Sequence, residues 1–134
     1  MLLRMVVDKV LKEYFITQYL IKTVILYGSF ASGNETDKSD VDIAIGGTEK
    51  FSPDILSALN LEISKLLNRE VDLVDLNYIS GTILTQILTK GTVLKKEDTI
   101  LYAELIKKML YFEEDMAPNI RYILDYRREK FLNA

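Results

Sequence analysis

The stretch YGSFASGNETDKSDVDIAI, residues 27–45, decides which fold the 134-residue chain can adopt. It joins the end of one apolar segment to the start of another through a polar loop. A Gly-Ser pair, Gly28 and Ser29, follows the first segment, and two acids, Asp40 and Asp42, open the second. Ten residues separate the two pairs. A buried strand does not ordinarily begin with two carboxylates, so their presence here needs an explanation.

The segments around this stretch alternate between helical and strand patterns, which predicts an α/β (α+β) domain with a small mixed sheet flanked by helices. The patterns predict helices over residues 5–20, 53–67, 79–90 and 99–113, and strands over residues 23–29, 40–45, 70–76 and 92–96, the last at an edge. A final helix is expected after Pro118. We expect one domain over residues 1–134, with a core over about 20–95 and a helical tail over about 99–134.

Several helix boundaries carry local signals. Ser52 followed by Pro53 is typical of an N-cap with proline at the first helical position. Asp98 is expected to cap the helix after it, and Gly91 to close the helix before it. The helix over 53–67 is expected to bury one stripe, formed by Ile55, Leu59, Ile63 and Leu67.

Composition restricts the chemistry that the chain can perform. It contains no cysteine and no histidine, so neither thiolate nor imidazole can act as base, nucleophile or metal ligand. Oxygen-seeking cations such as Mg²⁺ are then the expected metals. The net charge of −3 argues against nucleic acid as a direct partner. Because the apolar runs are too short for a membrane span and no signal peptide is recognisable, we expect a cytoplasmic protein without membrane association.

The alternation of side chains along a strand explains why two acids can open the second strand. Val41, Ile43 and Ile45 share one face of this strand, and Asp40 and Asp42 share the other. Asp72 takes the matching face of the next strand. If the two strands are neighbours, the three carboxylates meet and repel one another unless a cation lies between them. Mg²⁺ suits such a site, because it takes few carboxylates and leaves positions for phosphate oxygens.

The Gly-Ser pair supplies the other half of this site. A glycine after a strand lets the backbone approach a ligand closely, and the amides that follow can point at a phosphate. A helix that starts near Phe30 would add its positive end. Ser39 and Lys38 in the polar loop are further candidates for phosphate contacts, although a loop lysine is usually solvated. The stretch can therefore hold a polyphosphate and the metal that bridges it.

Each feature alone has a plainer interpretation. Gly-Ser after a strand is usually a turn, and Asp-x-Asp is usually a solvated face. Asp75 competes with Asp72 for the third acidic position, but it lies three residues further on and faces the other way, so we interpret it as a strand-end or turn residue. Only the combination of strand, Gly-Ser, loop, Asp-x-Asp strand and third acid favours a metal and nucleotide site.

The motif GSFASG followed by SDVDIAI resembles the nucleotidyltransferase signature of the DNA polymerase beta superfamily. The short chain also resembles the minimal nucleotidyltransferases (MNT) that are the antitoxins of HEPN–MNT toxin–antitoxin pairs. This resemblance implies a polymerase-beta-like fold in which Gly28 and Ser29 hold the triphosphate. It implies that Asp40 and Asp42 bind Mg²⁺ and that Asp72 is the third carboxylate.

The resemblance further implies an antitoxin of a type VII-like pair, which transfers AMP from ATP to a tyrosine of the partner HEPN ribonuclease toxin and so neutralises it within a hetero-oligomer. Asp72 would be a metal ligand, the acceptor of the tyrosine proton, or both. Ser32 stands where the family often carries arginine, which removes a phosphate-binding cation. The alternatives are a decayed transferase that neutralises the toxin by binding, and a small-molecule nucleotidyltransferase, for which the chain is short.

The tail beyond residue 98 has no expected role in the catalytic core. Its apolar positions at helical spacing are Leu101, Tyr102, Leu105, Met109, Leu110, Ile120, Ile123, Leu124 and Phe131. We expect part of this surface to dock the toxin as a helix in a groove. The alternative is that both tail helices complete the core.

Overall fold

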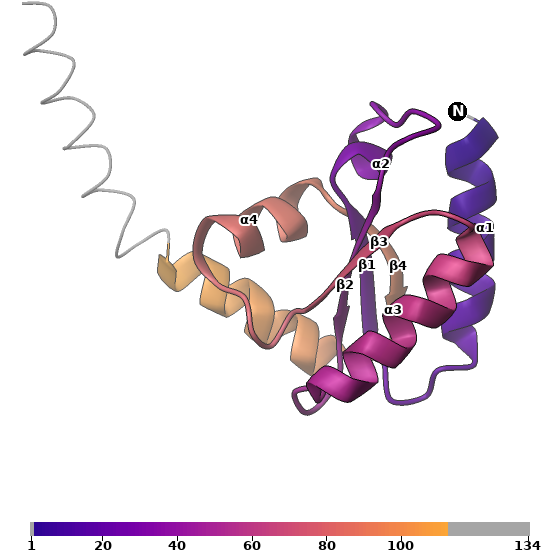
Figure 1. Ribbon diagram of the computed structural model, residues 1–134. Coiled ribbons are helices and arrows are strands. Elements are labelled where there is room, and N and C mark those ends of the chain that lie inside the picture. Colours follow the sequence, from indigo (N-terminus) through magenta and orange to yellow (C-terminus); the bar gives the residue numbers. More distant parts are fainter. Residues whose placement is uncertain (1, 113–134) are drawn as a thin grey trace, which may run out of the picture.

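The computed structural model describes residues 2–112 (Figure 1). Its elements are α1 (Leu2–Ile16), β1 (Thr23–Tyr27), α2 (Ser29–Ser32), β2 (Val41–Gly46), α3 (Pro53–Leu67), β3 (Val71–Asp75), α4 (Gly81–Lys90) and β4 (Thr92–Lys96). One more helix begins at residue 99 and continues through residue 112. The helix expected after Pro118, with its apolar residues, lies outside the described part of the chain. No helix among residues 2–112 has both the length and the apolar character of a membrane span.

The four strands form one mixed sheet in the order β3-β2-β1-β4. β1 pairs antiparallel with β2 and with β4, and β2 pairs parallel with β3. A parallel pair needs a crossover connection, and α3 provides it. The expected mixed sheet with an edge strand over 92–96 is confirmed. Its β2–β3 pair brings the two strands that carry the predicted acids side by side.

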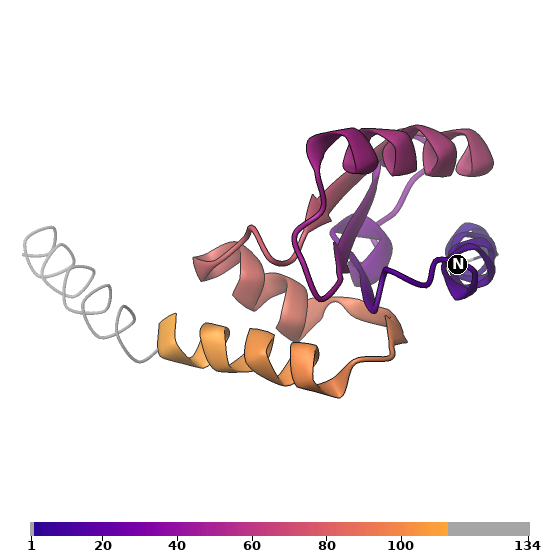
Figure 2. The same cartoon turned by 90° about the horizontal axis from the view of Figure 1, so that it is seen from below.

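Helices cover both faces of the sheet, as Figure 2 shows. α1 and α3 pack on the face that carries Val24, Leu26 and Ile43. α4 and the helix from residue 99 pack on the other face, which carries Ile25 and Ala44. The alternation of strand side chains therefore separates two apolar layers.

The helix from residue 99 completes the second layer. Leu101 and Leu105 are 9% and 4% exposed and join the cluster of Ile25, Leu84 and Ile87. Burying a leucine side chain contributes about 1.5–3 kcal/mol, so these two anchor the helix to the sheet. The expectation that the core does not need this segment is wrong for these residues, because α4 alone would leave part of the sheet face uncovered.

Local signals placed most helix boundaries correctly. The Ser52 hydroxyl accepts a hydrogen bond from the Ile55 amide at 3.3 Å, and the Asp98 carboxylate accepts one from the Leu101 amide at 3.0 Å. Gly91 follows α4 as expected, but with φ −75° rather than a left-handed conformation. A side chain at residue 91 would overlap the Ile25 side chain, so close packing explains the glycine.

Two expectations about helices are corrected. α1 ends at Ile16 rather than at residue 20, because the backbone turns there: the Gln18 amide donates to the Phe15 carbonyl at 3.2 Å and the Ile21 amide to the Gln18 carbonyl at 3.2 Å. The Lys95 ammonium of β4 donates to the same two carbonyls at 2.6 and 3.0 Å. In α3, Ile55 is 47% exposed, whereas its neighbour Leu56 packs on the core. The expected stripe therefore holds only from its second member onward.

Candidate active site

Three polar side chains lie in one row across the sheet. Tyr27 of β1 is the register partner of Asp42 in β2, and Asp42 is the partner of Asp72 in β3. Residues paired across strands project to the same face. This is the face of Ile25 and Ala44, which α4 covers. The expected meeting of Asp42 and Asp72 is thus produced by the parallel register.

Asp40 takes a different position from the one expected. β2 begins at Val41, so Asp40 lies just before the strand rather than on its face, and its side chain is exposed. It is nevertheless close enough for its charge to raise the pKa of Asp42. Asp40 therefore borders the Asp42–Asp72 pair from the loop side.

The electrostatics of this row favour a cation. Burial, then Asp72, then Asp40 raise the pKa of Asp42. Burial, then Asp72, then Asp42 raise the pKa of Tyr27 to about 12, so its hydroxyl stays protonated at neutral pH. Within residues 2–112, neither Asp42 nor Asp72 forms an ion pair that would offset this repulsion.

The described residues do not close into a complete metal cage. Among residues 2–112, no group of three or more acidic, histidine or cysteine side chains is placed to hold a metal ion by itself. Asp42 and Asp72 offer two facing carboxylates, and Asp40 is a near neighbour. Such an incomplete donor set fits Mg²⁺, which is commonly bound by one or two carboxylates together with substrate phosphates.

Gly28 joins the acids to the turn after β1. Its φ of 73° and ψ of −148° fall in a region that side chains rarely adopt. A Cβ at this position would overlap the Asp42 carboxylate. Glycine is therefore required both by the backbone conformation and by the close approach of β1 to Asp42.

Gly28 is also the N-cap of α2, a single turn that contains Ser29. Its carbonyl accepts hydrogen bonds from the amides of Ala31 and Ser32 at 3.1 Å each. The amides of Ser29 and Phe30 precede these two, so they lie at the open end of the turn. The Phe30 side chain is fully buried and anchors the turn in the core.

Ser39 organises the polar loop before Asp40. Its hydroxyl accepts a hydrogen bond from the Thr36 amide at 2.8 Å, and its carbonyl accepts one from Arg69 Nη1 at 3.0 Å. The Ser39 hydroxyl also lies 3.3 Å from the Thr36 hydroxyl, and either of the two can be the donor. The phosphate contact expected of Ser39 stays a prediction. Lys38 is exposed, as expected of a solvated loop lysine.

Arg69 connects the segments of the site, and sequence patterns gave no sign of it. Its guanidinium holds the Ser39 carbonyl and lies 5.3 Å from the centre of the Phe30 ring. It thus ties the start of β3 to α2 and to the loop that carries Asp40. No local signal distinguishes this arginine from any charged residue between a helix and a strand.

Asp75 is excluded from the site, as expected. It is 3% exposed, and its carboxylate accepts hydrogen bonds from the Phe51 amide at 2.8 Å and the Asn77 amide at 2.9 Å. The bond from Asn77 closes the turn after β3, and the bond from Phe51 ties the end of β3 to the connection between β2 and α3. Asp75 is a structural residue.

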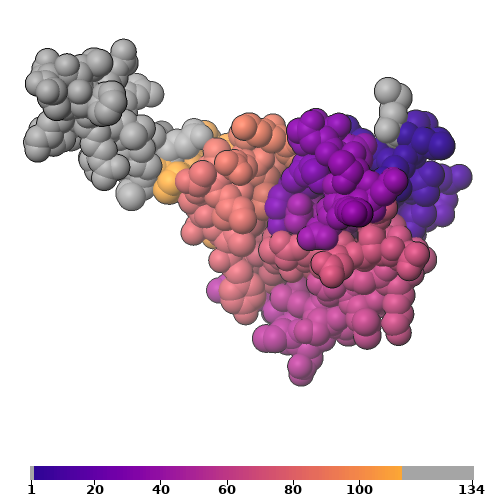
Figure 3. Space-filling model, turned by 45° about the horizontal axis from the view of Figure 1, so that its top comes forward, coloured from indigo at the N-terminus to yellow at the C-terminus, as the bar shows by residue number. Residues whose placement is uncertain are grey.

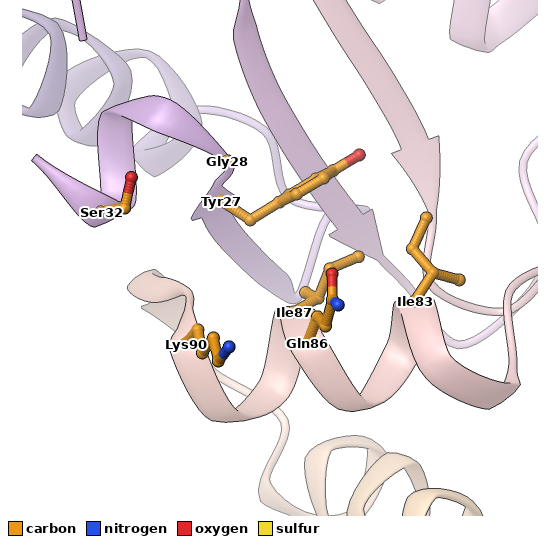
Figure 4. Close-up of a pocket in the computed structure, with 7 residues that line it drawn as sticks. All are labelled: Tyr27, Gly28, Ser32, Ile83, Gln86, Ile87 and Lys90. Atoms are coloured by element: carbon orange, nitrogen blue, oxygen red, sulfur yellow. The ribbon is translucent and has the colours of Figure 1, made fainter. Parts of the chain in front are cut away.

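A pocket of about 390 Å³ adjoins the row of polar side chains (Figure 4). It lies between the end of β1, α2 and α4, and it is lined by Tyr27, Gly28, Ser32, Ile83, Gln86, Ile87 and Lys90. The segments around α2 and α4 border one another on the surface in Figure 3. Sequence reasoning missed the α4 residues, because helical spacing marks Ile83 and Ile87 only as core.

Comparison with known proteins agrees with this geometry. Residues 9–100 match the family described as "Polymerase beta, Nucleotidyltransferase". The chain is 35% identical over 96 residues to a putative protein adenylyltransferase of Methanocaldococcus jannaschii, covering 70% of this chain and 84% of the relative. It is 29% identical over 85 residues to the protein adenylyltransferase MntA of Shewanella oneidensis, covering 62% of this chain and 61% of MntA.

Solved structures share the fold. A chain from a toxin–antitoxin crystal structure with AMP-PNP has a TM-score of 0.74 and 21% identity, covering 90% of this chain and 98% of that chain. A chain from a complex of tri-AMPylated Shewanella oneidensis HEPN toxin with MNT antitoxin has a TM-score of 0.68 and 20% identity, covering 92% and 98%. The expected polymerase-beta-like fold is therefore confirmed.

Proposed function

Because the chain belongs to the polymerase beta nucleotidyltransferase family, we propose that it is a protein adenylyltransferase and the antitoxin of a HEPN toxin. In this proposal it transfers AMP from ATP to a tyrosine of the toxin. The observation that carries the proposal is the pairing of Asp42 with Asp72 beside the Gly28 turn. The names of the relatives and the toxin–antitoxin complexes that share the fold support it.

Different residues would bind the metal and the phosphates. Asp42 and Asp72, with Asp40 beside them, would hold Mg²⁺, which supplies charge neutralisation on the triphosphate and the leaving pyrophosphate. The open end of the α2 turn, at Gly28 and Ser29, would orient the phosphates through backbone amides.

The transfer itself is an in-line displacement. The tyrosine oxygen attacks the α-phosphorus, a new O–P bond forms, and the bond from the α-phosphorus to the pyrophosphate oxygen breaks. The hydroxyl proton goes to a carboxylate, and Asp72 is the best-placed acceptor because it is exposed at the edge of the row. Positioning and charge stabilisation would supply most of the rate.

The direct test uses the partner toxin. The purified chain, Mg²⁺, ATP labelled at the α-phosphate and the product of the adjacent gene are incubated together. We expect label on a toxin tyrosine and loss of ribonuclease activity. Absence of label on the partner under every nucleotide supplied would contradict the proposal.

Ser32 favours a second candidate, a decayed transferase that neutralises the toxin by covering it. The exposed Ser32 side chain offers no positive charge to a phosphate. Calorimetric titration with AMP-PNP and Mg²⁺ separates the two candidates. Mg²⁺-dependent binding supports the enzyme, and toxin neutralisation without nucleotide binding supports the binding protein.

A further inference from the structure

The charged residue of the pocket beside Gly28 lies at one end of it (Figure 4). Ser32 and Lys90 lie at the end next to α2, whereas the Ile83 side chain lies toward the far end, near the Tyr27 ring. Its volume of about 390 Å³ falls within the range of small-molecule pockets. In the proposed function the triphosphate binds at the turn of Gly28 and Ser29, which is on the α2 side of this pocket.

Charge distinguishes Lys90 from the other residues of this pocket. The described lining contains no other cation and no acid. Lys90 is exposed, and its side chain makes no hydrogen bond or ion pair within residues 2–112, so its ammonium keeps three donors for a ligand. The neighbouring aspartates are all negative, and a triphosphate adds further negative charge. A cation on this wall of the pocket would therefore offset that negative charge and attract the triphosphate.

We propose that Lys90 binds the phosphates of ATP that are not transferred. This inference rests on the proposed function. Ser32 lies at the end of the single turn that begins after Gly28, and it lines the same pocket as Lys90. A phosphate chain that leaves Gly28 along α2 thus reaches the α4 wall at Lys90. Lys90 supplies from α4 the positive charge that Ser32 does not supply from α2.

A plainer explanation for Lys90 is its place in the last turn of α4, where a cation favours the helix C-terminus. Lys65 has the same place in the last turn of α3, which packs on the opposite face of the sheet. Lys65 is also exposed and lies outside the site. It is therefore a matched control for any effect that comes from helix stability.

The test compares Lys90→Ala with Lys65→Ala by calorimetric titration with AMP-PNP and with AMP, both with Mg²⁺. We expect Lys90→Ala to weaken AMP-PNP binding about tenfold or more, the effect of losing a hydrogen bond to a charged group. AMP binding should change little, because AMP lacks the phosphates that Lys90 contacts. Lys65→Ala should leave both affinities unchanged.

A rescue variant separates charge from folding. Ser32→Arg in the Lys90→Ala background puts a cation on the facing wall of the pocket and should recover most of the AMP-PNP affinity. Unchanged AMP-PNP affinity in Lys90→Ala overturns the inference, as does an equal loss for AMP-PNP and AMP. If the unmodified chain binds no AMP-PNP, the proposed function fails as well. If it binds and only Asp42→Asn weakens binding, the Lys90 inference alone is wrong.

Discussion

Asp42 of β2 and Asp72 of β3 are direct register partners in the parallel pair of the sheet, so two carboxylates face each other without a neutralising side chain in the described part of the chain. The burial of Asp42 and then the charge of Asp72 raise the pKa of Asp42. An arrangement that costs stability in the free protein and is relieved by a cation is typical of a functional site.

Asp42→Asn should abolish adenylyl transfer while leaving the protein folded. We expect a loss of at least about a hundredfold, because metal-assisted charge stabilisation contributes several kcal/mol. The fold should persist, since Asn keeps the shape and removes a repelled charge. Transfer to the toxin and thermal unfolding, each with and without Mg²⁺ and nucleotide, check this. An active variant, or an unfolded one, would contradict the assignment.

The stability of the metal-free protein should depend on pH through Asp42. Its pKa is raised in the folded state, so the folded protein holds this proton more tightly than the unfolded chain does. Ionised Asp42 therefore destabilises the fold at neutral pH. This cost disappears as the pH falls through the folded pKa toward the ordinary value of 3.8.

Urea unfolding between neutral pH and about pH 4 measures this effect. The difference in unfolding free energy between Asp42→Asn and the unmodified chain should be largest at neutral pH and shrink on acidification. A difference that does not change with pH would mean that Asp42 is not destabilised by its neighbours.

Gly28→Ala should damage both the fold and the site. The backbone conformation at Gly28 is one that only glycine adopts readily, and the new Cβ would displace the Asp42 carboxylate. Gly33→Ala is the control, because Gly33 has a φ of 80° but a Cβ there would meet no other atom within 4 Å. Gly33→Ala should cost about 1–2 kcal/mol of stability by strain alone. Only Gly28→Ala should also weaken Mg²⁺-dependent nucleotide binding, which calorimetry would show.

Arg69→Ala should loosen the connection between β3, α2 and the Asp40 loop. Losing the hydrogen bond to the Ser39 carbonyl and the contact with Phe30 should cost about 1–3 kcal/mol. Arg4→Ala, which removes a single hydrogen bond to Thr92 on the edge strand, is the control. The KM for ATP should rise in the Arg69 variant and not in the Arg4 variant. Equal KM values in both would show that Arg69 serves the fold alone.

Two leucines of the helix from residue 99 distinguish the part that belongs to the core from the part that is free to dock a partner. Leu105→Ala should cost about 2–5 kcal/mol, because Leu105 is buried against α4 and the sheet. Leu110→Ala should change stability by less than about 0.5 kcal/mol, because Leu110 is 48% exposed. If this surface docks the toxin, as the sequence predicts, Leu110→Ala should weaken toxin binding in a pull-down titration. Unchanged binding would exclude Leu110 from the docking surface.

The local chemistry of the chain was readable from the sequence. The strand before Gly28, the acid within β2 and Asp72 in β3 follow from period-two alternation and from glycine after a strand. The Ser52 and Asp98 caps were equally readable, because each acts within three residues of its own position. Asp40 fell one residue outside the strand, since pairing with β3 begins only at Val41.

Only the tertiary structure placed residues that act across long separations. Lys95 donates to the Phe15 carbonyl near the end of α1, Arg69 holds the Ser39 carbonyl, and Lys90 lies across the pocket from Ser32. None of these contacts leaves a periodic signal, because each joins elements whose packing is set by the whole core. The sequence alone determined which side chains had the required chemistry. The parallel register of β2 and β3 and the packing of α4 decided which of them meet, because those depend on apolar burial from every element at once.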